Sequence, residues 1–245
     1  MLKVLGIIPA RYESSRFPGK PLIDLKGKTM IQRVYEGTKK SQKLSEVIVA
    51  TDDKRIFDEV LRFGGKAMMT SKNHPSGTDR CGEVSSHFTD FDVVVNIQGD
   101  EPLVDFRQID SLIEAFENES TSIATLGIKS VSLEDLQNPN RIKIVVNQAN
   151  KALYFSRSCI PNFANYSENP LEFYPFLRHI GLYAYRTEVL QKLITLEPTK
   201  LEKIESLEQL RWLYYGFEIT VVETTIETPN IDVPADLEHV LKQLE

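Results

Sequence analysis

The stretch Val4-Leu-Gly-Ile-Ile-Pro-Ala-Arg-Tyr-Glu-Ser-Ser-Arg-Phe-Pro-Gly-Lys-Pro-Leu22 joins a short apolar run to a cationic loop. The run at residues 4–8 predicts a buried strand. The loop after it carries Arg11, Arg16 and Lys20, and prolines stiffen its backbone. Open α/β sheets bind ligands beyond the carboxyl ends of their strands. We therefore expect these cations to bind an anion such as a triphosphate; the alternative is a basic loop that only meets solvent.

Composition narrows the class of protein. The chain has 245 residues, 41% hydrophobic and 26% charged, and a formal net charge of −6. We expect a single domain over residues 1–245. The acidic balance argues against nucleic acid as a partner, because non-specific affinity for it comes mainly from neutralising phosphates. A small anion bound by a local cationic loop fits better.

Cysteines and apolar runs indicate the compartment. Cys81 and Cys159 show no C-x-x-C spacing, which favours a reducing environment. No apolar run approaches the roughly 20 residues of a membrane helix, and the first run is too short for a signal peptide. We expect a cytoplasmic protein with no membrane partner.

Strand and helix patterns alternate through the first half of the chain and return at its end. This order predicts a Rossmann-like, mostly parallel α/β sheet with helices on both faces. Strands are predicted at residues 4–8, 46–50, 66–69, 91–97, 122–126 and 218–223. Helices are predicted at residues 29–40, 78–88, 105–117, 204–215 and 234–244, with one more around residues 56–61 that Asp52 or Asp53 would cap.

The middle of the chain has a different pattern. Strands predicted at residues 141–146, 152–155 and 179–185 have no regular helices between them, and residues 160–176 are rich in proline, asparagine and aromatic side chains. We expect residues 142–186 to form an excursion with antiparallel pairing that serves in sugar binding and as a dimerisation arm.

Two acidic segments supply candidate metal ligands. Asp100 and Glu101 follow the strand at residues 91–97, and a parallel sheet would bring them beside the cationic loop. A carboxylate there can hold a Mg²⁺ ion that bridges phosphate oxygens; the alternative is a Gly-Asp turn before Pro102. Asp232 precedes a predicted helix, so it is either an N-cap or a second metal ligand. The spacing does not choose between them.

Polar side chains in the excursion suggest a second substrate. Arg157, Arg178 and His179 would suit a carboxylated, polyhydroxylated molecule; the alternative is the polar rim of a dimer interface. In the helix at residues 204–215, Glu208 and Gln209 would face a sugar while the leucines enter the core.

Taken in order, these segments resemble the cytidylyltransferases that activate 3-deoxy-manno-octulosonate (Kdo). Each match is weak alone, but the ordered set covers nearly the whole chain. The matching segments are Ile8-Pro-Ala-Arg-Tyr12, Ser15-Arg-Phe-Pro-Gly-Lys-Pro-Leu22, Val49-Ala-Thr-Asp52, Ser76-Gly-Thr-Asp-Arg80, Asn96-Ile-Gln-Gly-Asp-Glu-Pro102, Ala152-Leu-Tyr-Phe-Ser-Arg157, Arg178-His-Ile-Gly181 and Leu207-Glu-Gln-Leu-Arg211.

The resemblance implies a homodimer that converts CTP and Kdo to CMP-Kdo and diphosphate for lipopolysaccharide synthesis, with Mg²⁺ as cofactor. It assigns catalysis to Arg11, Lys20, Asp100 and Asp232, of which Asp100 and Asp232 would hold the metal. It assigns the nucleotide to Ala10, Arg16, Ser76, Thr78, Arg80 and Gln98. It assigns the sugar to Arg157, His179, Tyr183, Glu208 and Gln209.

One segment departs from the family pattern. The family usually has Gly-Val-Asp-Thr-Pro before the last helix, where this chain has Asn230-Ile-Asp-Val-Pro234. Asp232 is retained, so metal binding is still expected. Three alternatives stay open: a related acid sugar such as 8-amino-Kdo or a sialic acid, a non-catalytic CTP-binding regulator, and a structural dimer module.

Overall fold

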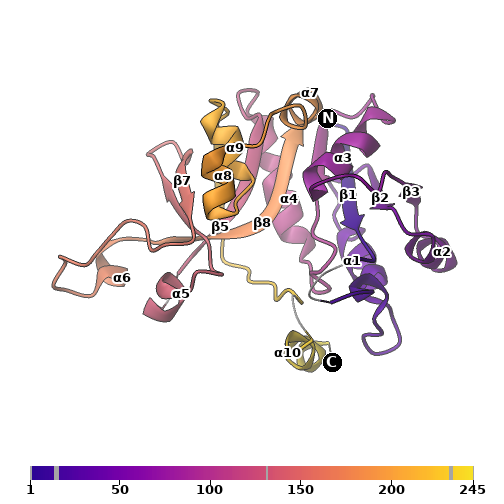
Figure 1. The fold of residues 1–245 in the computed structure, drawn as a ribbon, viewed down its shortest axis with the longest axis horizontal. Coiled ribbons are helices and arrows are strands. Elements are labelled where there is room, and N and C mark those ends of the chain that lie inside the picture. The colour runs from indigo at the N-terminus through magenta and orange to yellow at the C-terminus, as the bar shows by residue number, and fades with distance from the viewer. Residues whose placement is uncertain (1, 14–16, 131, 232–233, 245) are drawn as a thin grey trace.

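The computed structural model describes residues 2–13, 17–130, 132–231 and 234–244. Strands in these residues form one sheet with the order β3-β2-β1-β4-β8-β5-β9, and β6 joins β7 to β8 at its side (Figure 1). Their bounds are β1 Val4–Ala10, β2 Glu46–Thr51, β3 Ala67–Met69, β4 Val93–Asn96, β5 Ile123–Lys129, β6 Lys143–Val146, β7 Ala152–Ser156, β8 Leu177–Arg186 and β9 Ile219–Thr224.

The sheet is mostly parallel, which confirms the predicted fold class. β1 pairs in parallel with β2 and β4, and β5 pairs in parallel with β9. β8 runs antiparallel to both β4 and β5. The antiparallel pairs expected within residues 142–186 are present, but β8 continues from them into the middle of the main sheet rather than staying apart from it.

Helices cover both faces of the sheet, as predicted. One core lies between the sheet and α1, α2, α4 and α10; the other lies between the sheet and α3, α7 and α9. Alternate residues of β1 supply the two cores: Val4 and Ile8 point to one, Leu5 and Ile7 to the other. The bounds are α1 Met30–Thr38, α2 Lys54–Arg62, α3 Gly77–Ser86, α4 Phe106–Glu114, α7 Thr187–Leu193, α9 Gln209–Tyr214 and α10 Asp236–Gln243.

The predicted single helix at residues 204–215 is wrong. The structure has two short helices, α8 (Lys200–Glu205) and α9, separated by Ser206 in the left-handed conformation with φ 52°. α8 begins with a capping box between Thr199 and Glu202, and the amide of Leu207 closes its end on the Glu202 carbonyl. The apolar spacing of the two helices is continuous in sequence, so it did not reveal the break.

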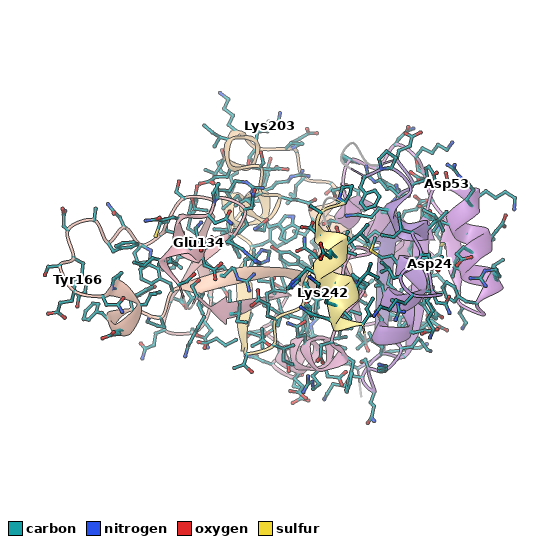
Figure 2. The ribbon with its side chains drawn as sticks, turned by 90° about the horizontal axis from the view of Figure 1, so that it is seen from below. Asp24, Asp53, Glu134, Tyr166, Lys203 and Lys242 are labelled. Carbon is teal, nitrogen blue, oxygen red and sulfur yellow. The ribbon has the colours of Figure 1, made fainter. Side chains whose placement is uncertain are left out.

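An arm extends from one end of the sheet. It contains the β6–β7 pair and two short helices that were not predicted, α5 (Leu133–Gln137) and α6 (Pro170–Phe173). Figure 2 shows Tyr166 at the outer end of this arm and Asp53 near the opposite end of the molecule. Within the described ranges, no helix has both the length and the apolar composition needed to cross a bilayer.

Candidate active site

Strand direction brings three segments of the candidate site to one edge of the sheet. β1 and β4 are parallel, so the residues after Ala10 and after Asn96 leave the sheet on the same side. β8 is antiparallel, with Tyr183 opposite Asn96, so its first residues lie on that side too. The Gln98 side-chain amide donates to the Gly181 carbonyl at 2.9 Å and joins two of the segments. Figure 2 looks onto this edge, where α10 with Lys242 lies.

Lys20 is the centre of a polar contact between distant parts of the chain. It opens the short 3-10 helix η1 (Lys20–Leu22). Its Nζ donates to Asp100 Oδ2 at 2.8 Å and to the Ile231 carbonyl at 2.7 Å. The Ile231 amide donates to the Asp100 carbonyl at 3.0 Å. The predicted closeness of the cationic loop and Asp100 is thus confirmed.

Two predicted site residues, Arg16 and Asp232, lie outside the described residues. Ile231, the described neighbour of Asp232 in sequence, is bonded to both Asp100 and Lys20. In the part of the chain that the structure describes, no group of three or more His, Cys, Asp or Glu side chains could hold a metal by itself. Mg²⁺ in phosphate-handling sites commonly takes one or two carboxylates plus substrate oxygens. The partly exposed Asp100 carboxylate fits that donor set.

Glu101 differs from its neighbour Asp100. Its side chain is buried, and burial together with the nearby Asp100 raises the pKa of Glu101 to about 8. Thr228 lies 3.4 Å from its Oε2. Glu101 is therefore easier to protonate than an exposed glutamate, while Asp100 faces Lys20.

A cavity of about 260 Å³ opens beside this group. Its lining includes side chains of both charges, among them residues that follow β4 and residues at the start of β8. Arg178 donates to Glu227 Oε1 at 2.6 Å, and Arg141 lies 3.7 Å from the same oxygen. No sequence pattern pointed to Arg141 or Glu227, because only the central position of β8 brings them together. The lining residues are Gln98, Asp100, Glu101, Asn140, Arg141, Ile142, Arg178, His179, Ile180, Gly181, Thr228 and Asn230.

The start of α3 joins two predicted sets of residues. Ser76 caps α3, and its hydroxyl lies 2.9 Å from Glu208 Oε1. Thr78 donates to Glu208 Oε2 at 2.7 Å. Burial raises the pKa of Glu208, although the two hydroxyls oppose this. Ser76 and Thr78, predicted for the nucleotide, thus lie against Glu208, predicted for the sugar.

Arg80 and Ala10 are buried. The Arg80 guanidinium contacts the Thr70 hydroxyl and lies 3.0 Å from Asp52 Oδ2. The side chain of Arg80 is fully buried, so the structure shows a support for the surrounding loops rather than a free cation. Ala10 is the last residue of β1 and is 3% exposed. The predicted nucleotide contacts of both residues stay predictions.

His179 is held neutral among aromatic rings. Burial, with the charge of Arg178, lowers the pKa of His179 to about 3. Its Nε2 lies 3.0 Å from the Thr125 hydroxyl, which donates to the Leu182 carbonyl at 2.9 Å. Because that hydroxyl has one proton, Nε2 carries the proton of the ring and Nδ1 is the acceptor. The ring centroid lies 5.2 Å from that of Tyr183.

Gln209 and Arg157 complete the predicted sugar set. The Gln209 side-chain nitrogen is buried without a hydrogen-bond partner in the described part of the structure. A buried unsatisfied donor costs about 1–3 kcal/mol, so this amide is suited to a polar ligand. Arg157 is already engaged, because it donates to the carbonyls of Glu205 at 2.8 Å and Pro139 at 3.0 Å. Its contact with a sugar stays a prediction.

Comparison with known proteins shows which family the chain is similar to. Residues 5–222 match the family described as Cytidylyltransferase. The chain is 46% identical to the 3-deoxy-manno-octulosonate cytidylyltransferase of Fusobacterium nucleatum over 100% of this chain and 98% of that protein. It is 51% identical to the enzyme of the same name from Bacteroides thetaiotaomicron, over 97% of this chain and 96% of that protein.

Solved structures show the same fold. A CMP:2-keto-3-deoxy-manno-octonic acid synthetase complexed with CTP superposes with a TM-score of 0.91 at 44% identity, covering 99% of this chain and 98% of that one. A 4-diphosphocytidyl-2C-methyl-D-erythritol synthase from Anaerococcus prevotii has a TM-score of 0.66 at 11% identity, over 99% and 98% of the two chains, and shares the fold alone. The chain therefore belongs to the 3-deoxy-manno-octulosonate cytidylyltransferase family, whose members are nucleotidyltransferases.

Proposed function

We propose that this protein transfers CMP from CTP to Kdo, giving CMP-Kdo and diphosphate for lipopolysaccharide synthesis. The observation that carries the proposal is the contact of Lys20 with Asp100 and the Ile231 carbonyl at the ligand-binding edge of the sheet. The names of the relatives support Kdo as the acceptor, and the CTP complex of the similar structure supports the nucleotide.

In the proposed reaction, the anomeric hydroxyl of the sugar attacks the α-phosphorus of CTP. A new P–O bond forms, the bond from the α-phosphorus to the oxygen that bridges to the β-phosphate breaks, and the proton of the hydroxyl passes to water or to the departing diphosphate. Negative charge builds up on the phosphate oxygens and on the departing diphosphate. Fixed cations stabilise such charge most when they are held in place beforehand. Lys20 fits this role because two oxygen acceptors already fix its Nζ.

Mg²⁺ is the proposed cofactor, held by Asp100 together with Asp232. When bound, the ion neutralises phosphate charge and orients the triphosphate. Asp100 is partly exposed, as a ligand shared with a substrate must be, and Lys20 orients its carboxylate. Arg11 and Arg16 are the further cations proposed for the triphosphate.

The sugar is proposed to bind beside the first half of β8. His179 offers an imidazole acceptor there, and Gln209 offers a buried donor without a partner in the described ranges. Arg157, Tyr183 and Glu208 remain part of the proposed sugar set. We also propose that Gln98, Ser76 and Thr78 lie near the nucleotide.

A diphosphate-release assay tests the function. With purified protein, CTP and Mg²⁺, we expect diphosphate only when Kdo is added, and mass spectrometry should show CMP-Kdo. Release without a sugar, or none with Kdo, would contradict the proposal. Equimolar competition with 8-amino-Kdo and a sialic acid separates related acid sugars. CTP binding without turnover on any of these sugars would instead favour a regulator.

We further propose that the protein acts in the cytoplasm as a homodimer. Large apolar side chains are exposed on neighbouring elements at the base of the arm, and such exposure is typical of interaction surfaces. They are Leu153 on β7, Ile204 on α8, and Tyr214 and Tyr215 at the end of α9.

A further inference from the structure

Arg11 is hydrogen-bonded to the loop that precedes α3. Its Nη2 donates to the main-chain carbonyl of His74 at 2.7 Å. His74 lies in the connection between β3 and α3, two residues before the cap residue Ser76. The direction of the Arg11 guanidinium therefore depends on where this loop holds one carbonyl.

Glu83, on α3, forms two further contacts with the same loop. Its Oε2 accepts from the Ser71 amide at 2.9 Å and contacts Nε2 of the His74 ring. The Ser71 hydroxyl accepts from the Asn73 amide at 3.1 Å, which tightens the turn between them. His74 and Glu83 are 19% and 28% exposed, so the pair is sheltered more than an ordinary surface ion pair.

Glu83 is the hydrogen-bond acceptor in its contact with His74. Burial by itself raises the pKa of Glu83, but the contacts with His74 and the Ser71 amide, and the nearby Arg80, lower it below its ordinary value. An ionised carboxylate only accepts hydrogen bonds. The proton between the two side chains therefore lies on His74 Nε2, and the bond is charge-assisted.

We propose that His74 and Glu83 form a positioning pair that aims Arg11 at the triphosphate. His74 faces two ways: its ring contacts Glu83, while its carbonyl receives the Arg11 guanidinium. Glu83 and Thr78 lie on the same helix. α3 therefore fixes the position of Arg11 relative to the Ser76 and Thr78 hydroxyls, which are proposed to lie near the nucleotide. This inference rests on the proposed function, since it assigns Arg11 to CTP chemistry.

A positioning role predicts a specific kinetic effect. Without the pair, the loop can still exist and CTP can still bind through the other cations, but the guanidinium is no longer fixed. Misplacement of a catalytic group by about 1 Å can cost roughly 100-fold in rate. We expect His74→Ala and Glu83→Gln to lower kcat by roughly 10- to 100-fold and to change KM for CTP much less.

A double-mutant cycle with Arg11 tests the coupling. In an Arg11→Ala background, His74→Ala should cause little further loss of kcat, because the group that it positions is absent. His74→Gln should recover most of the loss of His74→Ala, since its amide nitrogen can donate to Glu83. Asp58→Ala, which breaks the exposed Lys54–Asp58 pair on α2, is the matched control and should leave kcat unchanged.

The outcomes separate this inference from the proposed function. Full additivity of His74→Ala and Arg11→Ala in the cycle overturns the positioning role, as does an unchanged kcat in both His74→Ala and Glu83→Gln. Thermal unfolding of each variant detects a general loss of structure. If His74→Ala is unfolded, the kcat of the folded His74→Gln variant is compared with that of the wild type instead. If the wild-type protein releases no diphosphate with CTP and Kdo, the proposed function fails before the cycle begins.

Discussion

Lys20 is the residue whose surroundings most clearly indicate catalysis. Its side chain is 13% exposed, and it bonds to a carboxylate from the end of β4 and a carbonyl from residue 231. Lys28 differs, because 43% of its side chain is exposed and it pairs with Glu36 on the surface. Lys20 is instead held by the parts of the chain that would surround the triphosphate.

Replacing Lys20 by alanine should reduce kcat by roughly 10²–10³-fold, because a fixed cation that stabilises developing charge is removed. Steady-state diphosphate release at saturating CTP and Kdo measures the effect. Lys28→Ala, in the exposed pair with Glu36, is the matched control and should keep the wild-type rate. Equal rates for the wild type and Lys20→Ala would remove Lys20 from the mechanism.

The lowered pKa of His179 should make the free energy of unfolding depend on pH. Its pKa falls from 6.5 to about 3 on folding, because the ring is buried and lies near Arg178. Only the unfolded chain then takes up this proton between those two values. The free energy of unfolding should be fully retained above pH 6.5 and should decrease as the pH falls toward about 3.

Urea unfolding at a series of pH values, for the wild type and His179→Gln, measures this contribution. The glutamine variant cannot titrate, so its stability should fall less steeply between pH 6.5 and pH 4. Two parallel curves would show that His179 does not have the lowered pKa. The exposed His239→Gln variant is the control and should follow the wild type.

At the scale of elements, the break between α8 and α9 has a local cause. Ser206 adopts φ 52°, a conformation that costs a residue with a Cβ about 1–2 kcal/mol and costs glycine almost nothing. Glycine is the common residue where a helix ends in this way. A serine here maintains the turn at some expense in stability.

Ser206→Gly should therefore raise the free energy of unfolding by about 0.5–1 kcal/mol, after allowing for the greater freedom of glycine in the unfolded chain. Chemical denaturation measures the change. Lys203→Gly, inside α8 and exposed, should do the opposite and destabilise by about 0.5–1 kcal/mol. A loss of stability in Ser206→Gly would contradict the strain argument.

The elements also show what sequence patterns can and cannot predict. The closeness of Lys20 and Asp100 was predictable, because both follow strands of a parallel sheet and strand ends define an edge. The central position of β8 in the sheet was not predictable, because its pairing with β4 and β5 joins residues far apart in the chain. The link between Ser76 and Glu208 was missed for the same reason, since these residues are 132 positions apart. The His74–Glu83 contact was missed because it depends on how the loop before α3 folds back on that helix.

At the scale of the whole molecule, the site depends on one edge of the sheet. β1, β4 and β8 lie side by side in the sheet (Figure 1). The segments after β1 and β4 carry Arg11, Lys20 and Asp100 to that edge, and the antiparallel β8 carries His179 to it. The same reversal places the β6–β7 pair beside the start of β8, where the arm begins. The proposed sugar site and the proposed dimer contact are therefore linked by a single strand.

That link leads to a prediction about assembly. Leu153 and Tyr214 are 58% and 66% exposed, on elements that pack against each other, and we propose that a second copy covers both side chains. We expect the wild type to sediment as a dimer at micromolar concentration. Leu153→Asp combined with Tyr214→Asp should shift it to a monomer, because charge in an apolar interface costs several kcal/mol.

Leu61→Asp is the control for this prediction. Leu61 is 52% exposed on α2, at the end of the molecule away from the arm, so its replacement should leave the sedimentation coefficient of the wild type unchanged (Figure 1). A monomeric wild type, or a dimer that survives the double variant, would contradict the proposed interface.

Because β8 connects the arm to His179, dissociation should also raise KM for the sugar more than KM for CTP. An equal rise in both values would show that the arm and the sugar site are not linked in this way.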